Sequence, residues 1–220
     1  MSLTERQIVS LQSAIANYAF PPVYFDFCAN SKVEAKNMTE VESYIRKLLI
    51  SDDQQNILYG LANVLYWGYA QIGYRDVRVN RFLADTNGAH LSEFKLLTAN
   101  GIVPTLSAIK KIGIPQFSGI SFISKVLAFL DPDKYCVLDQ QLARLATGNS
   151  KNALNQLKQG QQIRVTKNNE ESYDFWRKEC TAISMKYFDS RYRVVDIERG
   201  FFHLVQTDQL LLAQRIYENS

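Results

Sequence analysis

Apolar side chains recur along this chain every three or four residues, the spacing that gathers them on one face of an α-helix. The clearest stripes cover residues 57–65, 122–129 and 194–205. The pattern predicts helices near residues 4–18, 38–49, 53–72, 75–84, 90–98, 104–111, 119–130, 138–146, 151–158, 170–187 and 194–206. Strands do not alternate with these helices, which argues against a parallel sheet and for an all-α fold.

The segment from Ala19 to Lys36 lacks this helical pattern and is expected to form a loop. Within it, residues 23–27 resemble a short extended piece, as do residues 162–165 further along the chain. Thr39 is followed three residues later by Glu42, which predicts a capping box at the start of the helix over 38–49.

The length of the chain, 220 residues, allows a sizeable core. We expect one helical domain over residues 1–220, with lobes over 1–100 and 101–220 around a cleft. Hydrophobic residues make up 46% of the sequence, which excludes a disordered chain by composition. No apolar run reaches the roughly 18 residues that a membrane span needs, so we expect no membrane partner.

The three cysteines, Cys28, Cys136 and Cys180, are far apart and odd in number. This pattern predicts reduced thiols in a cytoplasmic protein rather than a disulfide frame or a metal knuckle. The N-terminus lacks the charged and apolar regions of a signal peptide. His90 and His203 are too few for a His-rich metal site, so we expect no metal site. We also expect the protein to be a monomer.

The net charge is only +3, but it is unevenly placed. Residues 140–169 contain no Asp or Glu and hold five basic side chains: Arg144, Lys151, Lys158, Arg164 and Lys167. This basic window is either a solvated face or a strip that follows nucleic-acid phosphates.

The most informative segment runs from Ile109 to Asp139. It predicts a helix, a tight turn that contains Gly119, a second apolar helix, a loop with Pro132, and a carboxylate that opens another helix. Glycine adopts backbone conformations that other residues resist, which suits Gly119 to the turn. Backbone amides of such a turn, next to a helix N-terminus, can hold a phosphate without reading the base sequence.

On these residues the chain resembles the helix-hairpin-helix DNA glycosylase superfamily. Phe117-Ser118-Gly119 corresponds to the Gly-x-Gly of the family hairpin, with Phe117 in place of the first Gly. Val137-Leu138-Asp139 corresponds to the segment that ends in the family's catalytic Asp. The closest likeness is to bacterial proteins with an 8-oxoguanine DNA glycosylase-like fold, through Phe122–Lys125 and Asp196–Arg199. The clear part covers about residues 109–146, and the hairpin covers about 104–130.

The resemblance implies an all-α, two-lobed glycosylase fold and a hydrolase that flips a damaged or modified base out of double-stranded DNA and excises it. Asp139 would then be the catalytic carboxylate. The family's lyase Lys position is held by Ser121, and Lys125 lies one helical turn later. Lys125 could form a Schiff base, bind phosphate or be solvated, so we expect a monofunctional enzyme or one with weak AP-lyase activity. The resemblance implies no organic cofactor and a structural monovalent cation at the hairpin.

The expected DNA contacts come from the hairpin and the helix after Asp139, namely Gln116, Phe117, Ser118, Gly119, Ser121 and Arg144. Gln116 and Phe117 could wedge into the gap left by the flipped base, or Phe117 could anchor the hairpin. The candidate base pocket comprises Tyr66, Trp67, Tyr69 and Tyr74, and core packing is the alternative for each ring.

The remaining candidates carry charge. Arg75, Arg78 and Arg81 face either solvent or the DNA backbone. Asp196 and Glu198 are expected to be ordinary acidic residues at a helix N-terminus.

Two alternatives to an enzyme stay open. A non-catalytic helix-hairpin-helix DNA-binding protein is favoured by the missing first Gly and lyase Lys, and a helical interaction scaffold would bind no DNA. For the enzyme, the substrate is either an oxidised base in the cell's own DNA, as in base-excision repair, or a modified base in phage DNA, as in antiviral defence.

Overall fold

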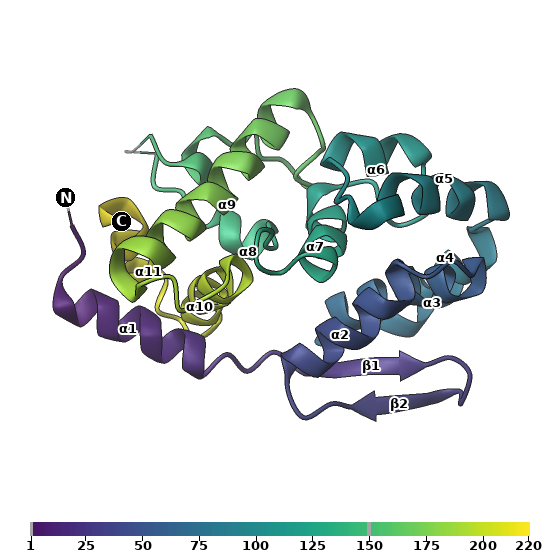
Figure 1. Cartoon of the computed structure of the whole chain (residues 1–220). Helices are drawn as coiled ribbons and strands as arrows, with labels where there is room; N and C mark the ends of the chain where they lie inside the picture. Colours follow the sequence, from purple (N-terminus) through teal and green to yellow (C-terminus); the bar gives the residue numbers. More distant parts are fainter. Residues whose placement is uncertain (1, 149–150) are drawn as a thin grey trace. The chain divides into compact units, whose positions relative to one another are not determined.

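A computed structural model describes residues 2–148 and 151–220 of the chain (Figure 1). Helices hold 62% of the residues, and the described part contains one two-stranded sheet, which confirms the all-α class. The chain divides into two compact units. We call Met1–Ala19 with Pro132–Ser220 the terminal unit, and Phe20–Asp131 the inserted unit.

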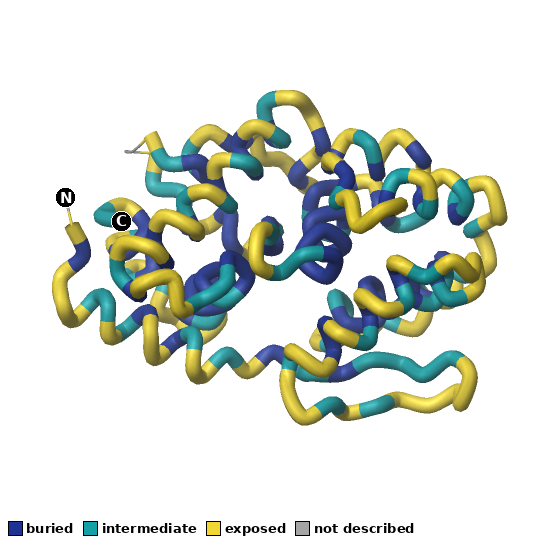
Figure 2. Tube along the Cα trace, in the orientation of Figure 1, coloured by how far each residue is buried: buried dark blue, intermediate teal, exposed yellow. Residues whose placement is uncertain are grey.

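The terminal unit is built from both ends of the chain. Its elements are α1 (Glu5–Ala16), α8 (Gln140–Ala143), a 3-10 turn η2 (Ala153–Gln156), α9 (Lys167–Phe188), α10 (Val194–Gln206) and α11 (Leu210–Asn219). α10 is buried along most of its length and packs against α1, α8, α9 and α11 (Figure 2). Gly200 allows the close approach of α1, because a Cβ there would lie 2.7 Å from Ile15 Cγ1 and 2.9 Å from Leu11 Cδ1.

The inserted unit is a continuous stretch of chain. Its elements are β1 (Val23–Asp26), β2 (Ser31–Glu34), α2 (Met38–Leu49), α3 (Gln54–Gly68), α4 (Arg75–Asp85), α5 (Gly88–Thr98), a 3-10 turn η1 (Ala99–Gly101), α6 (Leu106–Ile112) and α7 (Ile120–Leu130). α7 is apolar and almost wholly buried (Figure 2), and it contacts α2, α3 and α6.

A buried amide holds the β1–β2 hairpin onto α3. Asn63 Oδ1 accepts a hydrogen bond from Phe25 N at 2.7 Å, and Asn63 Nδ2 donates to Phe25 O at 3.0 Å. Val23 pairs with Glu34 in an antiparallel register. β1 thus confirms the short extended piece expected over residues 23–27, whereas the loop expected over the rest of residues 19–36 is wrong at residues 31–34, which form β2. The second strand was missed because Ser31–Glu34 is mostly exposed and polar, and so carries no apolar alternation.

Most predicted helices occur within a few residues of their expected bounds, but the structure differs from the prediction at five points. The segments over 138–146 and 151–158 shrink to α8 and to the η2 turn, and α11 was not expected at all. Residues 162–165 form no strand of the described sheet. The helix over 38–49 is capped by Asn37, whose Oδ1 accepts from Glu40 N at 3.1 Å, and not by Thr39, which lies inside the helix.

The expected lobe boundary at residue 100 also differs from the observed division. α1 packs with α10 and α11, while α6 and α7 pack with α5, α2 and α3. The first helix therefore belongs with the end of the chain, and the predicted hairpin belongs with the preceding helices.

Candidate functional site

The predicted hairpin consists of α6, a tight turn over residues 113–119, and α7. Gly113 ends α6 with a left-handed φ of +78°, and Gln116 also lies in the left-handed region with a φ of +70°. Gly119, in contrast, has an extended φ of −116° and forms the N-cap of α7. The unusual conformation that we expected at Gly119 is thus found at Gly113 and Gln116, because the chain reverses before α7 begins.

Phe117 anchors this turn. Its side chain is 1% exposed, with its ring centroid 5.8 Å from that of Phe82 and 6.3 Å from that of Phe122. A ring in this position cannot reach into DNA without leaving the core, so the anchor is the alternative that fits. Ser118 beside it is exposed, and Gln116 is half-buried.

Residues after α3 meet the turn. Arg78 Nη1 donates to Gln116 Oε1 at 3.3 Å, and its guanidinium carbon lies 5.8 Å from the centre of the Tyr74 ring. The Tyr69 ring lies 4.6 Å from the Phe122 ring at the start of α7, and burial raises the pKa of Tyr69. The structure therefore brings Tyr69 and Tyr74 together with the turn, and Tyr74 is 56% exposed.

The other two candidate pocket rings are core residues. Trp67 is 4% exposed and packs between Phe20 at 4.9 Å and Phe129 at 5.1 Å. Tyr66 is also buried, with the Arg75 guanidinium 4.1 Å above its ring. Among the four predicted pocket residues, Tyr69 and Tyr74 keep accessible surface near the turn.

Lys125 lies on α7 with its amine folded back toward the turn. The residue is 6% exposed, and its Nζ donates to Ser121 O and to Ser121 Oγ, each at 3.2 Å. The amine of residue 125 thus rests on residue 121, the position at which the resembling family carries its lyase Lys. Gly68 makes room for this arrangement, since a Cβ there would lie 2.6 Å from Phe122 Cε1 and 3.2 Å from Lys125 Cδ.

Asp139 is the N-cap of α8. Its Oδ1 accepts hydrogen bonds from Gln141 N at 3.0 Å and Leu142 N at 3.2 Å, and the residue keeps partial exposure. Arg144 at the other end of α8 is exposed, and its Nη1 donates to Gln141 Oε1 at 2.8 Å. The carboxylate at residue 139 is therefore held in place from its C-terminal side by backbone amides.

Three buried side chains grip the chain just before Asp139. Tyr173 Oη donates to Cys136 O at 2.8 Å, and Trp176 Nε1 donates to Val137 O at 3.1 Å, both from α9. Glu198 Oε2, from α10, accepts from Val137 N at 3.2 Å. We call these three contacts the 136–137 clamp. The sequence predicted Glu198 only as a helix-terminal charge, and gave no indication that Tyr173 and Trp176 reach this segment.

Tyr18 and Arg199 belong to the same region of the terminal unit. Burial raises the pKa of the Tyr18 phenol, the Arg199 guanidinium 5.3 Å from its ring opposes that rise, and the Glu198 and Asp139 carboxylates add to it. Asp196 pairs with Arg193 at 2.8 Å and with Arg199 at 3.7 Å. Asp196 therefore has the structural role expected for it, whereas Tyr18 was not anticipated.

The predicted site residues fall into both units. Gln116, Lys125 and the tyrosines belong to the inserted unit, and Asp139 and Arg144 belong to the terminal unit.

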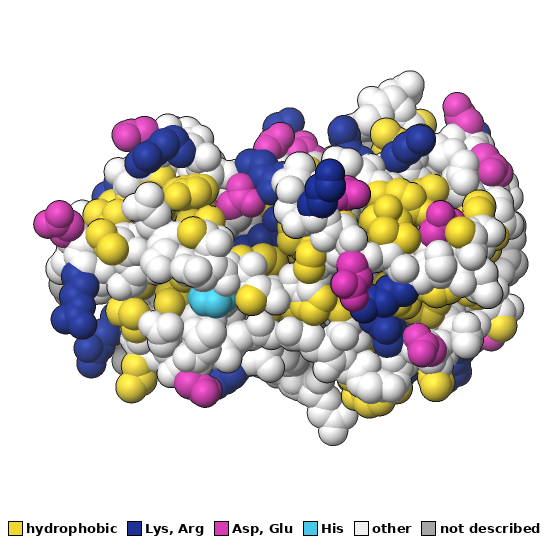
Figure 3. Space-filling model, turned by 90° about the horizontal axis from the view of Figure 1, so that it is seen from below, with side chains coloured by type: hydrophobic (Ala, Val, Ile, Leu, Met, Phe, Trp, Pro, Cys, Tyr) yellow, Lys and Arg dark blue, Asp and Glu magenta, His cyan; other side chains and the backbone are white. Residues whose placement is uncertain are grey.

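On the face shown in Figure 3, Lys and Arg side chains are interspersed with Asp and Glu. Across residues 2–148 and 151–220, no group of three or more His, Cys, Asp or Glu side chains could hold a metal ion. No helix in that part of the chain is both long and apolar enough to cross a membrane.

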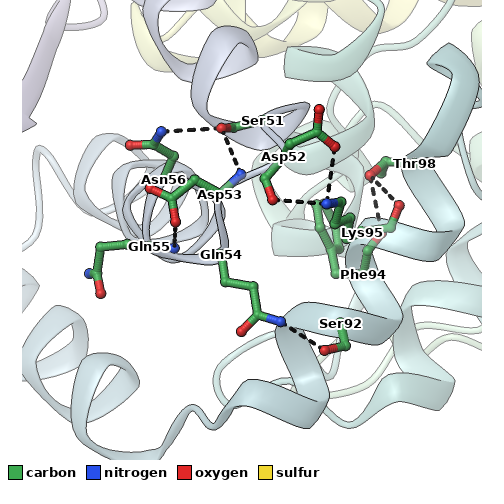
Figure 4. Close-up of polar contacts among 10 residues, drawn as sticks. All are labelled: Ser51, Asp52, Asp53, Gln54, Gln55, Asn56, Ser92, Phe94, Lys95 and Thr98. Carbon is green, nitrogen blue, oxygen red and sulfur yellow. Dashed lines mark hydrogen bonds and ion pairs between the residues drawn. The ribbon is translucent and has the colours of Figure 1, made fainter.

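A hollow of about 360 Å³ lies in the inserted unit, beside Arg46, Asp52 and Lys95. Lys95 Nζ donates to Asp52 O at 2.8 Å and lies 3.0 Å from Asp52 Oδ1 (Figure 4). Arg46 Nε donates to Leu130 O at 2.9 Å, which caps the end of α7. Both cations are engaged with oxygens of their own unit.

Comparisons of this chain with protein-family models, with curated proteins and with solved structures find no match.

Proposed function

We propose that the protein is a DNA glycosylase that flips a damaged or modified base out of double-stranded DNA and hydrolyses its N-glycosidic bond. The observation that carries the proposal is the fixed position of Asp139. The 136–137 clamp holds the chain before it, two backbone amides hold its Oδ1, and the residue keeps partial exposure. A carboxylate held in this way can stabilise the positive charge that develops on the sugar as the base leaves.

The reaction is a hydrolysis at the sugar carbon C1′. Water adds its oxygen to C1′, the electron pair of the C–N bond leaves with the base, and the proton released by the water ends on the base. Asp139 aligns that water or stabilises the oxocarbenium-like sugar. Neither role requires an organic cofactor.

Lys125 supports a second, weaker activity. Its buried amine contacts Ser121, so it lies at the start of α7, where the resembling family carries its lyase amine. Attack by this amine on C1′ in place of water would displace the base with the electron pair of its C–N bond, and an amine proton would pass to the base. Opening of the sugar ring at the C1′–O4′ bond, with the proton that the nitrogen loses going to O4′, would then give a Schiff base, and loss of a C2′ proton would expel the 3′ phosphate and cleave the strand. Phosphate binding is the other role for a cation at this position. We propose base hydrolysis as the main reaction, with at most weak strand cleavage.

The 113–119 turn supplies the proposed grip on DNA. Ser118 is exposed on it and Ser121 is half-buried in the first turn of α7, a helix terminus suited to a phosphate, whereas Gly119, the N-cap of α7, is buried. Gln116 in the turn, and Tyr69 and Tyr74 beside it, would contact the opened duplex or the extruded base. The resemblance further implies a monovalent cation held by backbone carbonyls of the turn.

Base release from a panel of modified duplexes and from phage genomic DNA tests the proposal. Asp139→Asn is the informative variant, because Asn caps helices as well as Asp does and so preserves the fold while removing the charge. We expect it to abolish base release and to leave DNA affinity similar or higher. Asp133→Asn, an exposed Asp upstream, is the matched control and should react like the wild type.

DNA binding without chemistry is the second candidate function. It is favoured by the ordinary capping role of Asp139 and by Phe117 in place of the first hairpin Gly. On this reading no modified duplex releases a base, while wild type and Asp139→Asn bind DNA alike. Borohydride trapping with wild type and Lys125→Gln separates the two roles of Lys125, since only a Schiff base leaves a covalent adduct.

A further inference from the structure

A polar groove of about 590 Å³ lies on the terminal unit, along the loop that precedes α9. We call residues 158–166 the 158–166 loop. Lys158, Arg164 and Thr166 line the groove together with Gln and Gly residues, and none of the lining residues described is acidic. Lys158 and Arg164 are both exposed.

A single buried residue fixes the shape of this loop. Asn169 is 1% exposed, and its Oδ1 accepts from Lys158 N at 2.8 Å. Its Nδ2 donates to Lys158 O at 3.1 Å and to Arg164 O at 2.9 Å. The side-chain amide of Asn169 therefore holds the backbone at both Lys158 and Arg164, so the positions from which the two charged side chains extend are fixed.

The same loop is tied to the helix that Asp139 opens. Gln140 Nε2 donates to Gly160 O at 3.1 Å, and Gln159 Nε2 donates to Ala143 O at 3.4 Å. Because α8 begins at Asp139, the groove and the candidate catalytic carboxylate are parts of one hydrogen-bonded assembly.

The chemistry of the groove suits a phosphodiester. Two cations and several amide side chains offer hydrogen-bond donors, and no carboxylate in residues 140–169 repels an anion. The other three basic residues of the window lie outside the groove. Arg144 bonds to Gln141, while Lys151 and Lys167 do not line the groove. Of the five basic residues of the window, two, Lys158 and Arg164, therefore lie together on one groove whose backbone is held by hydrogen bonds.

We propose that the 158–166 loop binds backbone phosphates of the DNA strand whose nucleotide reaches Asp139, with Lys158 and Arg164 as the contacting cations. The identity of the bound strand rests on the proposed function, because that function is what brings a nucleotide to Asp139. Phosphate contacts of this kind set the register of a protein on DNA without reading sequence. The groove would therefore position the strand beside α8 and leave base choice to other residues.

The test is the salt dependence of duplex binding. Each phosphate contact contributes roughly 0.9 to the slope of log affinity against log salt, so K158Q/R164Q should reduce the slope by roughly 1.8. The matched control is K151Q/K167Q, which removes two exposed charges from the same basic window but outside the groove. We expect the control to keep the wild-type slope. Equal slopes for the two double variants, or an unchanged slope for K158Q/R164Q, would overturn the proposal.

Two further measurements distinguish a failure of this inference from a failure of the proposed function, and DNA binding from the binding of a free anion. If the wild type releases no base but only K158Q/R164Q loses slope, the groove stands and the glycosylase proposal fails. If base release occurs and K158Q/R164Q binds like the wild type, the groove fails alone. Inorganic phosphate is titrated against the same proteins. One outcome would reject the DNA backbone as the ligand: K158Q/R164Q loses the binding of inorganic phosphate but binds the duplex like the wild type. The groove would then bind a free anion.

Discussion

The substitution Tyr173→Phe tests whether the 136–137 clamp stabilises the protein. It removes one hydroxyl group, which donates to Cys136 O at 2.8 Å, and it keeps the ring that fills the core. Tyr173 is 1% exposed and Cys136 is buried, so water cannot replace the lost donor. A buried carbonyl left without a partner costs about 1–3 kcal/mol, and we expect a loss of about 2 kcal/mol in the free energy of unfolding. That loss corresponds to a change of roughly 30-fold in the ratio of folded to unfolded protein.

Urea unfolding followed by circular dichroism measures this loss as a shift of the midpoint at constant slope. Tyr135→Phe is the matched control, since that ring is half-buried beneath the Arg177 guanidinium at 4.9 Å. Its effect should lie within about 0.5 kcal/mol of zero. If Tyr173→Phe shifts the midpoint no more than Tyr135→Phe does, the hydroxyl does not hold the segment before Asp139, and the carboxylate of Asp139 is not fixed by the 136–137 clamp.

Three further outcomes follow from burial. Phe117→Ala should lower the free energy of unfolding by about 3–5 kcal/mol in urea titration, because it empties a core position; a near-neutral change would instead favour a wedge into DNA. Native protein should react with one equivalent of a thiol reagent, at the exposed Cys28, and denatured protein with three, because burial raises the pKa values of the Cys136 and Cys180 thiols. Asn169→Ala should speed trypsin cleavage within the loop that Asn169 holds, and cleavage at the wild-type rate would contradict the assigned hydrogen bonds.

Helices were predictable here because the sequence pattern that indicates a helix lies within the helix itself. The apolar stripes over α3, α7 and α10 each lie within one helix of two to four turns, and tertiary packing only adjusts the ends of these helices. Helix starts were harder to predict. Both Asn37 with Glu40 and Thr39 with Glu42 have the spacing of a capped start, and the structure uses the first pair. The spacing of two candidate caps cannot reveal which one the chain adopts.

The candidate site was only partly predictable for a different reason. Asp139 and the segment 117–125 form a recognisable local pattern, so they could be selected from the sequence. The 136–137 clamp joins residues about 40 to 60 positions apart, as do the contacts of Arg78 with Gln116. A tyrosine on an amphipathic helix resembles any other core residue until its hydroxyl is seen to meet a distant carbonyl. Contacts of this kind depend on the tertiary fold.

The assembly of the terminal unit from both chain ends has a consequence for biosynthesis. α1 is translated before residues 20–131, whereas its packing partners α10 and α11 are translated after them. Residues 20–131 form a continuous stretch and a compact unit of their own, so all of that unit is translated before α10 and α11. A nascent chain stalled before residue 194 would therefore lack the two helices that pack on α1, which leaves the apolar face of that helix uncovered.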